Sequence, residues 1–436
     1  MTSQEGITAT SGAKNLQGYK LGKVIIEGKT KKVYEIECQP DEAIIVSKDR
    51  ITAGDGVKSH ELKGKAAIST ATNAKVFDLL NKVGLKTSFI KVISDTAFLA
   101  RKCQMIPIEW VARRLATGSF LKRNPGVEEG YRFTPPLIET FFKDDANHDP
   151  QWSEHQIIAA NFKLNGVTIT RHEVDIMRRT TVTVFEVLER AWESRNCALI
   201  DMKIEFGIDS NGEILVSDII DSDSWRLWPS GDKRLMKDKQ VYRNLEKVTD
   251  ADLETIKSNF MWIASQLEYF SQSSTGLAVV LMGSPSDQEH ARKIEKTCQI
   301  IGLPCELRVT SAHKGTEETL KIAAEYEGSG RDVVLIAVAG RSNGLGPVLS
   351  GNTTLPVINS PPVNSSNMSQ DIWSSLCTPS GLSCTTVLYP ETAALAAGQI
   401  LAMKSHVLWG TLRVKNLSNY LALKKADQRM RTNKEI

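Results

Sequence analysis

An apolar run over 333–338 leads directly into the glycine-rich segment 339–352, which contains four glycines. A continuous apolar run of this length is typical of a strand that is buried on both faces. Glycines in the following turn let backbone N–H groups approach a ligand closely, and Arg341, Ser342 and Asn343 add polar side chains at the strand's carboxyl end. The pattern therefore predicts either a ligand-binding loop or an ordinary tight turn.

Length, charge and cysteine content limit the class of protein. At about 150 residues per domain, 436 residues predict two or three domains. The net charge of +3 argues against a nucleic-acid-binding protein, and seven scattered cysteines without a C-x-x-C pair favour a reducing compartment. The segment 1–18 is polar and is expected to be a flexible tail without a signal peptide. Because no run reaches about 18 apolar residues, we expect a cytoplasmic protein that does not enter a membrane.

The hydrophobic pattern changes along the chain and predicts two different folds. Alternating apolar patterns mixed with helical stretches predict an α+β domain over 19–265, and the short polar segment 266–275 suits a linker. Strands and helices alternate over 276–436, which predicts an α/β domain with a doubly wound parallel sheet and sites at the strands' carboxyl ends. We expect the basic stretch 421–434 to be a solvated or packing helix rather than a nucleic-acid arm.

Three predicted strand ends of the C-terminal domain carry polar chemistry. Ser284, Ser286 and Asp287 follow the first strand and lie at a predicted helix N-terminus. They either cap this helix or bind a phosphate there. His313 and Lys314 follow the second strand, and the glycine-rich loop follows the third. Because these strand ends meet at one edge of a parallel sheet, His313 is a candidate for proton transfer.

These segments resemble the aminoimidazole ribonucleotide (AIR) carboxylases of purine synthesis. The resemblance covers about 276–436 and depends on Gly-Ser-Pro-Ser-Asp at 283–287, Ser-Ala-His-Lys at 311–314 and Ala-Gly-Arg-Ser-Asn-Gly-Leu-Gly at 339–346. Lysine after the histidine, together with Gly-Arg-Ser-Asn, is similar to the class that uses CO2 directly, without ATP or biotin. The expected product is the carboxylated ribonucleotide (CAIR).

The resemblance implies a role for each residue. Ser284, Ser286 and Asp287 hold the ribose phosphate, and His313 removes the ring proton after the enamine-like carbon has attacked CO2. Ser383 stands where close relatives are expected to have glycine. The other expected site residues are Lys314, Ser342 and Gly340 near CO2, and Ser311, Arg341 and Asn343 on the ribonucleotide.

The N-terminal domain contains a lysine-bearing glycine turn at 28–30. A P-loop would need glycine where the chain has Lys23, and the segment 33–36 continues as a strand instead of opening a helix. Lys29 and Lys31 instead suit a flap whose charges face the β- and γ-phosphates of a nucleotide. The alternative is an ordinary exposed hairpin.

Acidic residues follow in two segments, 199–207 and 214–221, which are predicted to pair as strands. Lys203, Glu205 and Asp218 could share one face of this otherwise apolar hairpin. Buried carboxylates need a partner, which here is either Mg²⁺ on nucleotide phosphates or a structural ion pair with Lys203.

A second anion site is expected in the same domain. Arg113 and Arg114 precede Thr-Gly-Ser-Phe-Leu-Lys at 117–122, and together these residues would bind an anion. The segment 142–149 adds a polar, acidic loop.

These motifs, with those at 106–113 and 221–226, resemble SAICAR synthetase, the ATP-dependent ligase that joins aspartate to CAIR. The resemblance covers about 19–265. It implies γ-phosphoryl transfer to the substrate carboxylate and attack of the aspartate amine on the acyl phosphate. The implied site comprises Lys29, Lys31, Met105, Glu109, Lys143 and Lys203 around ATP, Glu205 and Asp218 at Mg²⁺, and Arg113, Ser119, Asp223 and Arg226 around the ribonucleotide.

Both resemblances in one chain are typical of the animal-type bifunctional family of purine synthesis. We expect carboxylation of AIR with CO2 to CAIR, followed by ligation of CAIR with aspartate and ATP to give SAICAR, ADP and phosphate. The C-terminal family implies a homo-octamer, in which the apolar helices predicted over 393–401 and 406–412 either contact neighbours or complete the domain core. Two alternatives are a nucleotide-binding scaffold without turnover and a ligase whose C-terminal half only drives assembly.

Overall fold

The computed structural model describes residues 8–10, 13–54, 56–272 and 275–431. Its internal contacts divide the chain into two compact units. Unit 1 consists of Met1–Gln272 and Val414–Ile436, and unit 2 consists of Ser273–Arg413. Each unit has its own sheets and its own core, so the two are described separately.

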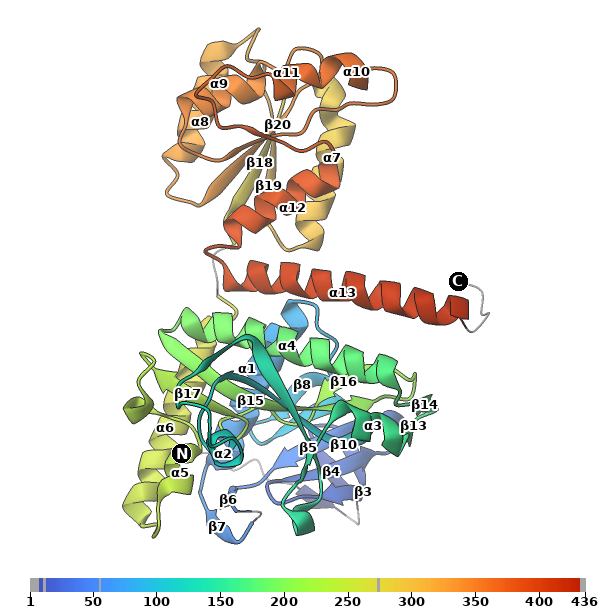
Figure 1. Cartoon of the computed structure of the whole chain (residues 1–436), viewed down its shortest axis with the longest axis vertical. Helices are drawn as coiled ribbons and strands as arrows, with labels where there is room; N and C mark the ends of the chain where they lie inside the picture. Colours follow the sequence, from blue (N-terminus) through green and yellow to red (C-terminus); the bar gives the residue numbers. More distant parts are fainter. Residues whose placement is uncertain (1–7, 11–12, 55, 273–274, 432–436) are drawn as a thin grey trace. The chain divides into compact units, whose positions relative to one another are not determined.

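Two antiparallel sheets form the framework of unit 1 (Figure 1). The first has the order β1-β2-β3-β4-β5-β9-β8 and the second has the order β12-β11-β10-β15-β16, with β17 also paired to β15. Strands of the first sheet are β1 (Thr8–Thr10), β2 (Ala13–Leu16), β3 (Tyr19–Glu27), β4 (Lys31–Ile36), β5 (Gln39–Ser47), β8 (Phe89–Ser94) and β9 (Ala97–Arg101). Strands of the second are β10 (Gln104–Leu115), β11 (Arg132–Phe142), β12 (Gln151–Trp152), β15 (Cys197–Ile208), β16 (Ile214–Ser217) and β17 (Trp225–Pro229). Two short hairpins are β6 (Arg50–Ala53) with β7 (Lys58–Glu61) and β13 (Lys163–Leu164) with β14 (Val167–Thr168).

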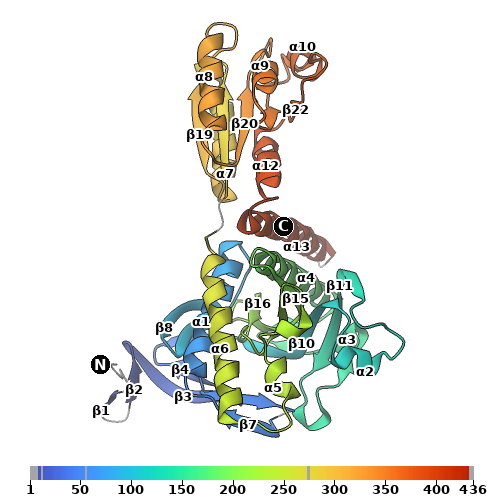
Figure 2. The same ribbon diagram turned by 90° about the vertical axis from the view of Figure 1, so that its left-hand side faces the viewer.

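Helices of unit 1 pack on these sheets through apolar faces. Helix α4 begins after Thr170, which forms a capping box with Glu173, and it buries Val184, Leu188 and Trp192 on the face that packs on β15. Helices α1 and α6 lie side by side (Figure 2). The helices are α1 (Lys65–Lys82), α2 (Ser119–Arg123), α3 (Glu154–Ala160), α4 (Arg171–Glu193), α5 (Gln240–Asn244) and α6 (Asp250–Gln266), with 3-10 turns η1 (Asp145–Asn147), η2 (Lys233–Leu235) and η3 (Leu267–Tyr269). This α+β arrangement confirms the fold class that the sequence predicts.

Unit 2 is a doubly wound α/β domain, as predicted. Its five-stranded sheet is parallel throughout and has the order β19-β18-β20-β21-β22. Val280 faces a core that includes Ile294 of α7, whereas its neighbour Val279 faces a core that includes Ile322 of α8. Because alternate residues point to opposite faces, strands that are covered by helices on both sides are apolar throughout. The elements are β18 (Leu277–Met282), η4 (Pro285–Asp287), α7 (Gln288–Ile300), β19 (Cys305–Val309), α8 (Thr316–Glu327), β20 (Val333–Val338), α9 (Leu345–Asn352), β21 (Val357–Asn359), α10 (Met368–Asp371), α11 (Trp373–Leu376), β22 (Thr385–Thr386), α12 (Pro390–Leu401) and α13 (His406–Arg431).

Segment boundaries differ from the prediction at two places in unit 1. Part of the expected tail 1–18 is strand, because β2 pairs with the edge of β3. Residues 1–7, 11 and 12 of that tail lie outside the described residues. The expected linker 266–275 begins as the 3-10 turn η3, which directly follows α6, and its residues 273 and 274 also lie outside the described part.

Helix α13 begins in unit 2 and ends in unit 1. We expected 276–436 to form one domain, but within the described residues the contacts of 414–431 belong to unit 1. The hydroxyl of Tyr420 donates to Asp175 Oδ2 of α4 at 2.6 Å, and Lys424 Nζ lies 3.0 Å from the same oxygen. The guanidinium of Arg179 stacks 3.8 Å from the centre of the Tyr420 ring. Neither α13 nor any other helix in the described part of the chain is long and apolar enough to cross a membrane.

Replacing Tyr420 by phenylalanine tests this packing. Because the substitution removes one hydrogen bond to an ionised carboxylate, we expect the free energy of local opening of α13 within unit 1 to fall by about 1 kcal/mol. Amide hydrogen exchange should become faster in 414–431 and in α4 while staying unchanged in β18 and β20. Tyr131→Phe, at an exposed side chain, is the control. Unchanged exchange in 414–431 would contradict the packing described.

Candidate active sites

A cavity of about 580 Å³ lies in unit 1. It is bordered by the turn between β3 and β4, by β6, β10, β11 and β15, by α2, and by the segments after η1 and β16. Predicted site residues that line it are Lys29, Lys31, Glu109, Arg113, Ser119, Lys203, Asp218, Asp223 and Arg226. Three others, Met105, Lys143 and Glu205, do not line it, but Lys143 and Glu205 connect to it through ion pairs.

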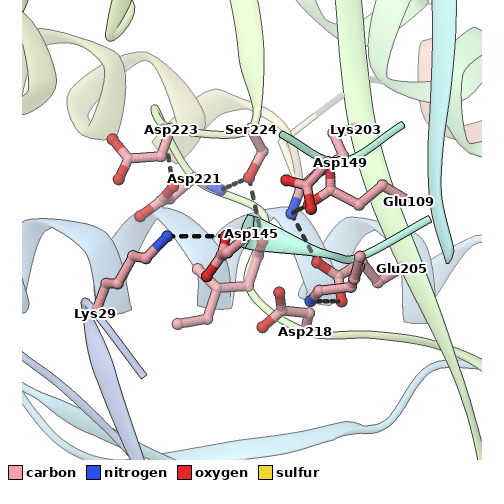
Figure 3. Close-up of polar contacts among 12 residues, drawn as sticks. Lys29, Glu109, Asp145, Asp149, Lys203, Glu205, Asp218, Asp221, Asp223 and Ser224 are labelled. Atoms are coloured by element: carbon pink, nitrogen blue, oxygen red, sulfur yellow. Dashed lines mark hydrogen bonds and ion pairs between the residues drawn. The ribbon is translucent and has the colours of Figure 1, made fainter. Parts of the chain in front are cut away.

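Glu205 is the centre of a network of lysines and carboxylates (Figure 3). Its side chain is only 2% exposed, and Lys203 Nζ and Lys143 Nζ each donate to it at 2.7 Å. Lys203 also donates to Glu109 at 3.0 Å, and Glu109 lies on β10 directly opposite Glu205 of β15. Burial alone would raise the pKa of Glu205, but the ammonium groups of Lys203, Lys143 and Lys31 lower that pKa to about 2. The ion pair between Lys203 and Glu205 that we considered as an alternative is therefore present.

Asp218 lies next to this network. Glu205 pairs in register with Ser217, so Asp218 follows immediately at the end of β16, with a backbone φ of 66°. Its carboxylate forms an ion pair with Lys31. The predicted face of the hairpin therefore does bring Lys203, Glu205 and Asp218 to one place beside the pocket.

The lysine turn joins two antiparallel strands, β3 and β4, as predicted. Gly28 N–H donates to the carbonyl of Lys31 at 2.9 Å, which closes the turn. Lys29 Nζ donates to Asp145 Oδ1 at 2.9 Å, so the acidic loop after β11 lies against the flap (Figure 3). A strand follows the turn where a P-loop would open a helix, so the P-loop is excluded here.

The other end of the pocket is rich in arginine. Arg113 is buried and donates to Glu139 at 2.7 and 3.0 Å and to Asp201 at 2.5 Å, and Arg226 donates to Asp201 as well. Gly118 precedes α2 with a φ of 61°, and a Cβ at this position would lie 2.5 Å from Arg226 Nη2. Glycine is therefore required for Arg226 to approach this turn.

Arg114 does not join this end of the pocket, contrary to our expectation. It forms a two-pronged ion pair with Glu189 of α4, with both N–O distances at 2.6 Å, and it does not line the cavity. Consecutive residues of β10 point to opposite faces of the sheet, so only Arg113 faces the pocket. A strand assignment for this segment, which we did not make from the sequence, would have separated the two arginines.

The sequence analysis did not predict several residues that line the pocket. Asp201 precedes Lys203 and Glu205 at alternate positions of β15, a spacing that would have identified it as facing the same side. The others lie in loops or short helices, where no periodicity marks them: Arg123, Asp221, Lys239 and Arg243.

In unit 2 the predicted residues follow the adjacent strands β19, β18 and β20. Ser284 Oγ accepts the N–H of Ser286 at 3.3 Å, so the capping alternative is present, and burial raises the pKa of the half-buried Asp287. His313 is exposed, and a Cβ on Gly344 would lie 2.7 Å from its Nε2 atom. The structure therefore brings the predicted proton-transfer histidine against the glycine-rich loop.

Asn343 anchors that loop from inside. Its Nδ2 donates to Asn359 at 3.1 Å and to Ser375 at 3.0 Å, and its Oδ1 accepts the N–H of Gly346 at 3.1 Å. It is 3% exposed, whereas its neighbours Arg341 and Ser342 are exposed. We expected Asn343 to contact the ribonucleotide, but this geometry uses its whole amide to fix the loop.

The remaining predicted residues of unit 2 lie beside these. Ser311 Oγ accepts the N–H of Lys314 at 3.3 Å, and the Lys314 side chain is exposed. The backbone N–H of Ser383 donates to Ser350 Oγ of α9 at 3.0 Å, a contact that does not involve the serine side chain. Gly340 lies two residues after the end of β20, near the ring of Pro362.

Comparisons with known proteins match a different family model to each half of the chain. The family model for SAICAR synthetase matches 24–258, and the model for AIR carboxylase matches 277–420. A Drosophila melanogaster bifunctional phosphoribosylaminoimidazole carboxylase/phosphoribosylaminoimidazole succinocarboxamide synthetase is 63% identical over 97% of this chain and 99% of its own length. The Homo sapiens protein of the same name is 55% identical over 94% of this chain and 97% of its own length.

Solved structures resemble unit 1 as well. A SAICAR synthetase (Type-2) in complex with ADP is 31% identical, with a TM-score of 0.50 over 56% of this chain and 97% of that chain. The synthase from Ehrlichia chaffeensis is 28% identical, with a TM-score of 0.50 over 56% of this chain and 98% of that chain. The chain therefore belongs to the family of bifunctional phosphoribosylaminoimidazole carboxylases and phosphoribosylaminoimidazole succinocarboxamide synthetases.

Proposed function

We propose that unit 2 carboxylates AIR with CO2 through His313 and that unit 1 converts the product, CAIR, to SAICAR in a pocket with separate nucleotide and ribonucleotide ends. The observation that carries the ligase assignment is the single cavity that joins a lysine–carboxylate end to an arginine end. ATP and CAIR are both anionic, so each requires a cationic surface, and a transfer between them requires that both lie in one cavity. The family membership of the chain supports the same pair of reactions.

At the nucleotide end, Lys29 and Lys31 of the flap and Lys203 of β15 supply positive charge for the phosphates. Glu109, opposite Glu205 on the neighbouring strand, accepts from Lys203 and fixes its ammonium group. Glu205 does the same for Lys143 and Lys203, so these cations are oriented before a nucleotide binds. We propose that Met105 of β10 lies in the nucleotide site, as the family resemblance implies.

Glu205 and Asp218 fit a Mg²⁺ ion that is shared with the nucleotide. No group of three or more His, Cys, Asp or Glu side chains in the described residues is arranged to hold a metal alone. Mg²⁺ usually binds one or two carboxylates plus substrate phosphates and water, and Asp218 can exchange its ion pair with Lys31 for such a cation. A bound Mg²⁺ would neutralise charge on the phosphate oxygens.

At the ribonucleotide end, Arg113, Ser119, Asp223 and Arg226 surround CAIR in this proposal. Glu139 and Asp201 hold the two arginines rigidly, which aligns the substrate carboxylate for phosphorylation. The aspartate amine then attacks the resulting acyl phosphate, and phosphate leaves.

In unit 2, Ser284, Ser286 and Asp287 are proposed to hold the ribose phosphate, with Ser311, Lys314, Gly340, Arg341 and Ser342 around the base and CO2. After carbon–carbon bond formation, His313 takes the ring proton. We further propose a cytoplasmic homo-octamer without biotin. All seven cysteines are free, which suits a reducing compartment, and the exposed Trp373 and Tyr389 of unit 2 suit subunit contacts.

Asp218→Asn tests the metal assignment. Asparagine has the same shape and tolerates a positive φ, so the hairpin should be preserved. We expect ligase turnover to fall by about 100-fold, because one anionic ligand is lost. The Mg²⁺ concentration that gives half-maximal ligase activity should rise for the same reason. AIR carboxylation should be unchanged, and the exposed Asp95→Asn is the control. An unaltered Mg²⁺ requirement would remove Asp218 from the metal site.

His313→Ala tests the carboxylase base. We expect AIR carboxylation to fall by about 100-fold or more, because a positioned base is lost, while SAICAR formation from supplied CAIR continues. Lys321→Ala, at an exposed position of α8, is the control. Carboxylation at the full rate in His313→Ala would show that another group removes the proton.

Gly344→Ala tests the position of the same histidine without changing its chemistry. The added Cβ would lie 2.7 Å from His313 Nε2, so the ring must move, and we expect carboxylation to slow by about tenfold or more. Gly126→Ala is the matched control, because a Cβ there meets no atom within 4 Å. Equal carboxylation rates in the two variants would mean that the close approach of His313 to the loop is irrelevant to the reaction.

A further inference from the structure

A buried lysine lies behind the ribonucleotide end of the ligase pocket and has no role in the ligase reaction proposed for that pocket. Lys65 is the first residue of α1, and its side chain is only 3% exposed. Its Nζ atom donates to Asp223 Oδ2 at 3.1 Å. Asp223 lines the pocket and Lys65 does not. Since burying an ammonium group is costly unless it is paired, the burial of Lys65 requires an explanation.

Helix formation does not supply that reason. A cation in the first turn opposes the helix dipole, and the preceding residue, Gly64, has a φ of 90° and provides no side-chain cap. An acidic or neutral residue would suit α1 better at this position. The partner of Lys65, rather than the helix, therefore accounts for the buried charge.

The two oxygens of Asp223 differ in their surroundings. Oδ2 lies 3.1 Å from Lys65 Nζ and 3.3 Å from Lys239 Nζ. Oδ1 is buried and accepts no hydrogen bond from any described residue. The backbone N–H of Asp223 donates to Asp221 Oδ1 at 2.8 Å, which fixes the turn that carries the carboxylate. One oxygen is thus held by two lysines, and the other lacks a donor.

An unpaired buried carboxylate oxygen is unfavourable, so it marks a place where a donor is missing. The pocket that Asp223 lines is the proposed site of CAIR, whose ribose hydroxyls and amino group are donors. We propose that Lys65 is a positioning residue of the ligase, which holds the carboxylate of Asp223 so that its second oxygen accepts a hydrogen bond from an O–H or N–H group of the ribonucleotide. This inference depends on the proposed placement of CAIR at the arginine end.

The charges around Asp223 support this role. Burial alone would raise its pKa, but Lys65 and Lys239 lower that pKa below the usual range, so the carboxylate remains an acceptor at neutral pH. Arg243 adds positive charge nearby, and Asp221 adds negative charge that faces both lysines. Removing Lys65 takes away one of the two ammonium groups, so the pKa of Asp223 should rise.

The test uses the full-length enzyme with Lys65→Met, Lys65→Arg and Lys75→Met. Lys75 lies on the same helix and pairs with Glu268 far from the pocket lining, so it is the matched control. We expect Lys65→Met to raise KM for CAIR by about tenfold with little change in KM for ATP, and Lys65→Arg to restore most of the affinity. AIR carboxylation by the same preparation should be unchanged and reports the concentration of folded chain.

The pH dependence separates this role from simple packing. In Lys65→Met, KM for CAIR should rise further as the pH is lowered, because the raised pKa of Asp223 lets this carboxylate become protonated at a higher pH than in the unmodified enzyme, whose KM should vary less. An equal rise in KM for ATP and CAIR, or an unchanged KM for CAIR, would overturn the proposal. The latter result would mean that an internal water or another group satisfies Asp223.

Asp223→Asn distinguishes a failure of this inference from a failure of the proposed site. If Asp223→Asn leaves KM for CAIR unchanged, the placement of the ribonucleotide is wrong. If Asp223→Asn raises KM but Lys65→Met does not, only the role of Lys65 is wrong. When Lys65 acts through Asp223, adding Lys65→Met to Asp223→Asn has little further effect, and additive effects would contradict this coupling. If Lys65→Met fails to fold, the comparison of Lys65→Arg with Lys65→Arg/Asp223→Asn gives the same decision.

Discussion

The ionised state of a buried carboxylate, Glu205, is the constraint on which the ligase pocket depends. A carboxylate that is 2% exposed stays charged only when cations surround it, and Glu205 receives Lys203 from its own strand and Lys143 from the loop after β11. Lys31, from the flap of the first sheet, also lowers its pKa. Three separated segments of the chain therefore meet at one charge. Two of these lysines, Lys31 and Lys203, line the cavity, so the interaction that satisfies the buried carboxylate also builds part of the anion-binding surface.

Unit 2 also contains a buried polar side chain whose hydrogen-bonding groups must be satisfied, but there the groups are neutral. The buried amide of Asn343 donates to Asn359 and Ser375 and accepts from Gly346, so its donors and its acceptor are satisfied. Gly346 permits this because a Cβ there would overlap with Asn359 Oδ1. The loop is thus held from inside while Arg341 and Ser342 stay exposed beside His313. In both units a buried polar group holds neighbouring side chains or backbone in place beside the proposed ligand site.

The parallel sheet was the part of the fold that could be predicted most accurately from the sequence. The predicted strand 333–338 is observed as β20 with the same bounds, and its neighbour β18 is also apolar throughout, because both strands are covered on both faces. The strand-end rule then located His313 and the glycine-rich loop, although it could not show that Asn343 points inward.

The contacts that prediction missed join residues far apart in the chain. Tyr420 and Asp175 are separated by 245 positions, so no local pattern could assign the end of α13 to unit 1. Lys65 begins a helix, where a lysine normally suggests a solvent-exposed position, and only the approach of Asp223 makes it a buried partner. The faces of Arg113 and Arg114, by contrast, could have been separated by strand alternation alone.

The central claim is that one chain carries two reactions in sequence, one in each unit. The most direct measurement supplies the purified full-length protein with AIR and bicarbonate, first alone and then with ATP, Mg²⁺ and aspartate, and separates the products by chromatography. The account predicts CAIR without ATP and SAICAR once ATP and aspartate are present. SAICAR formation only from supplied CAIR, with no carboxylation of AIR under either condition, would contradict it and reduce unit 2 to a scaffold.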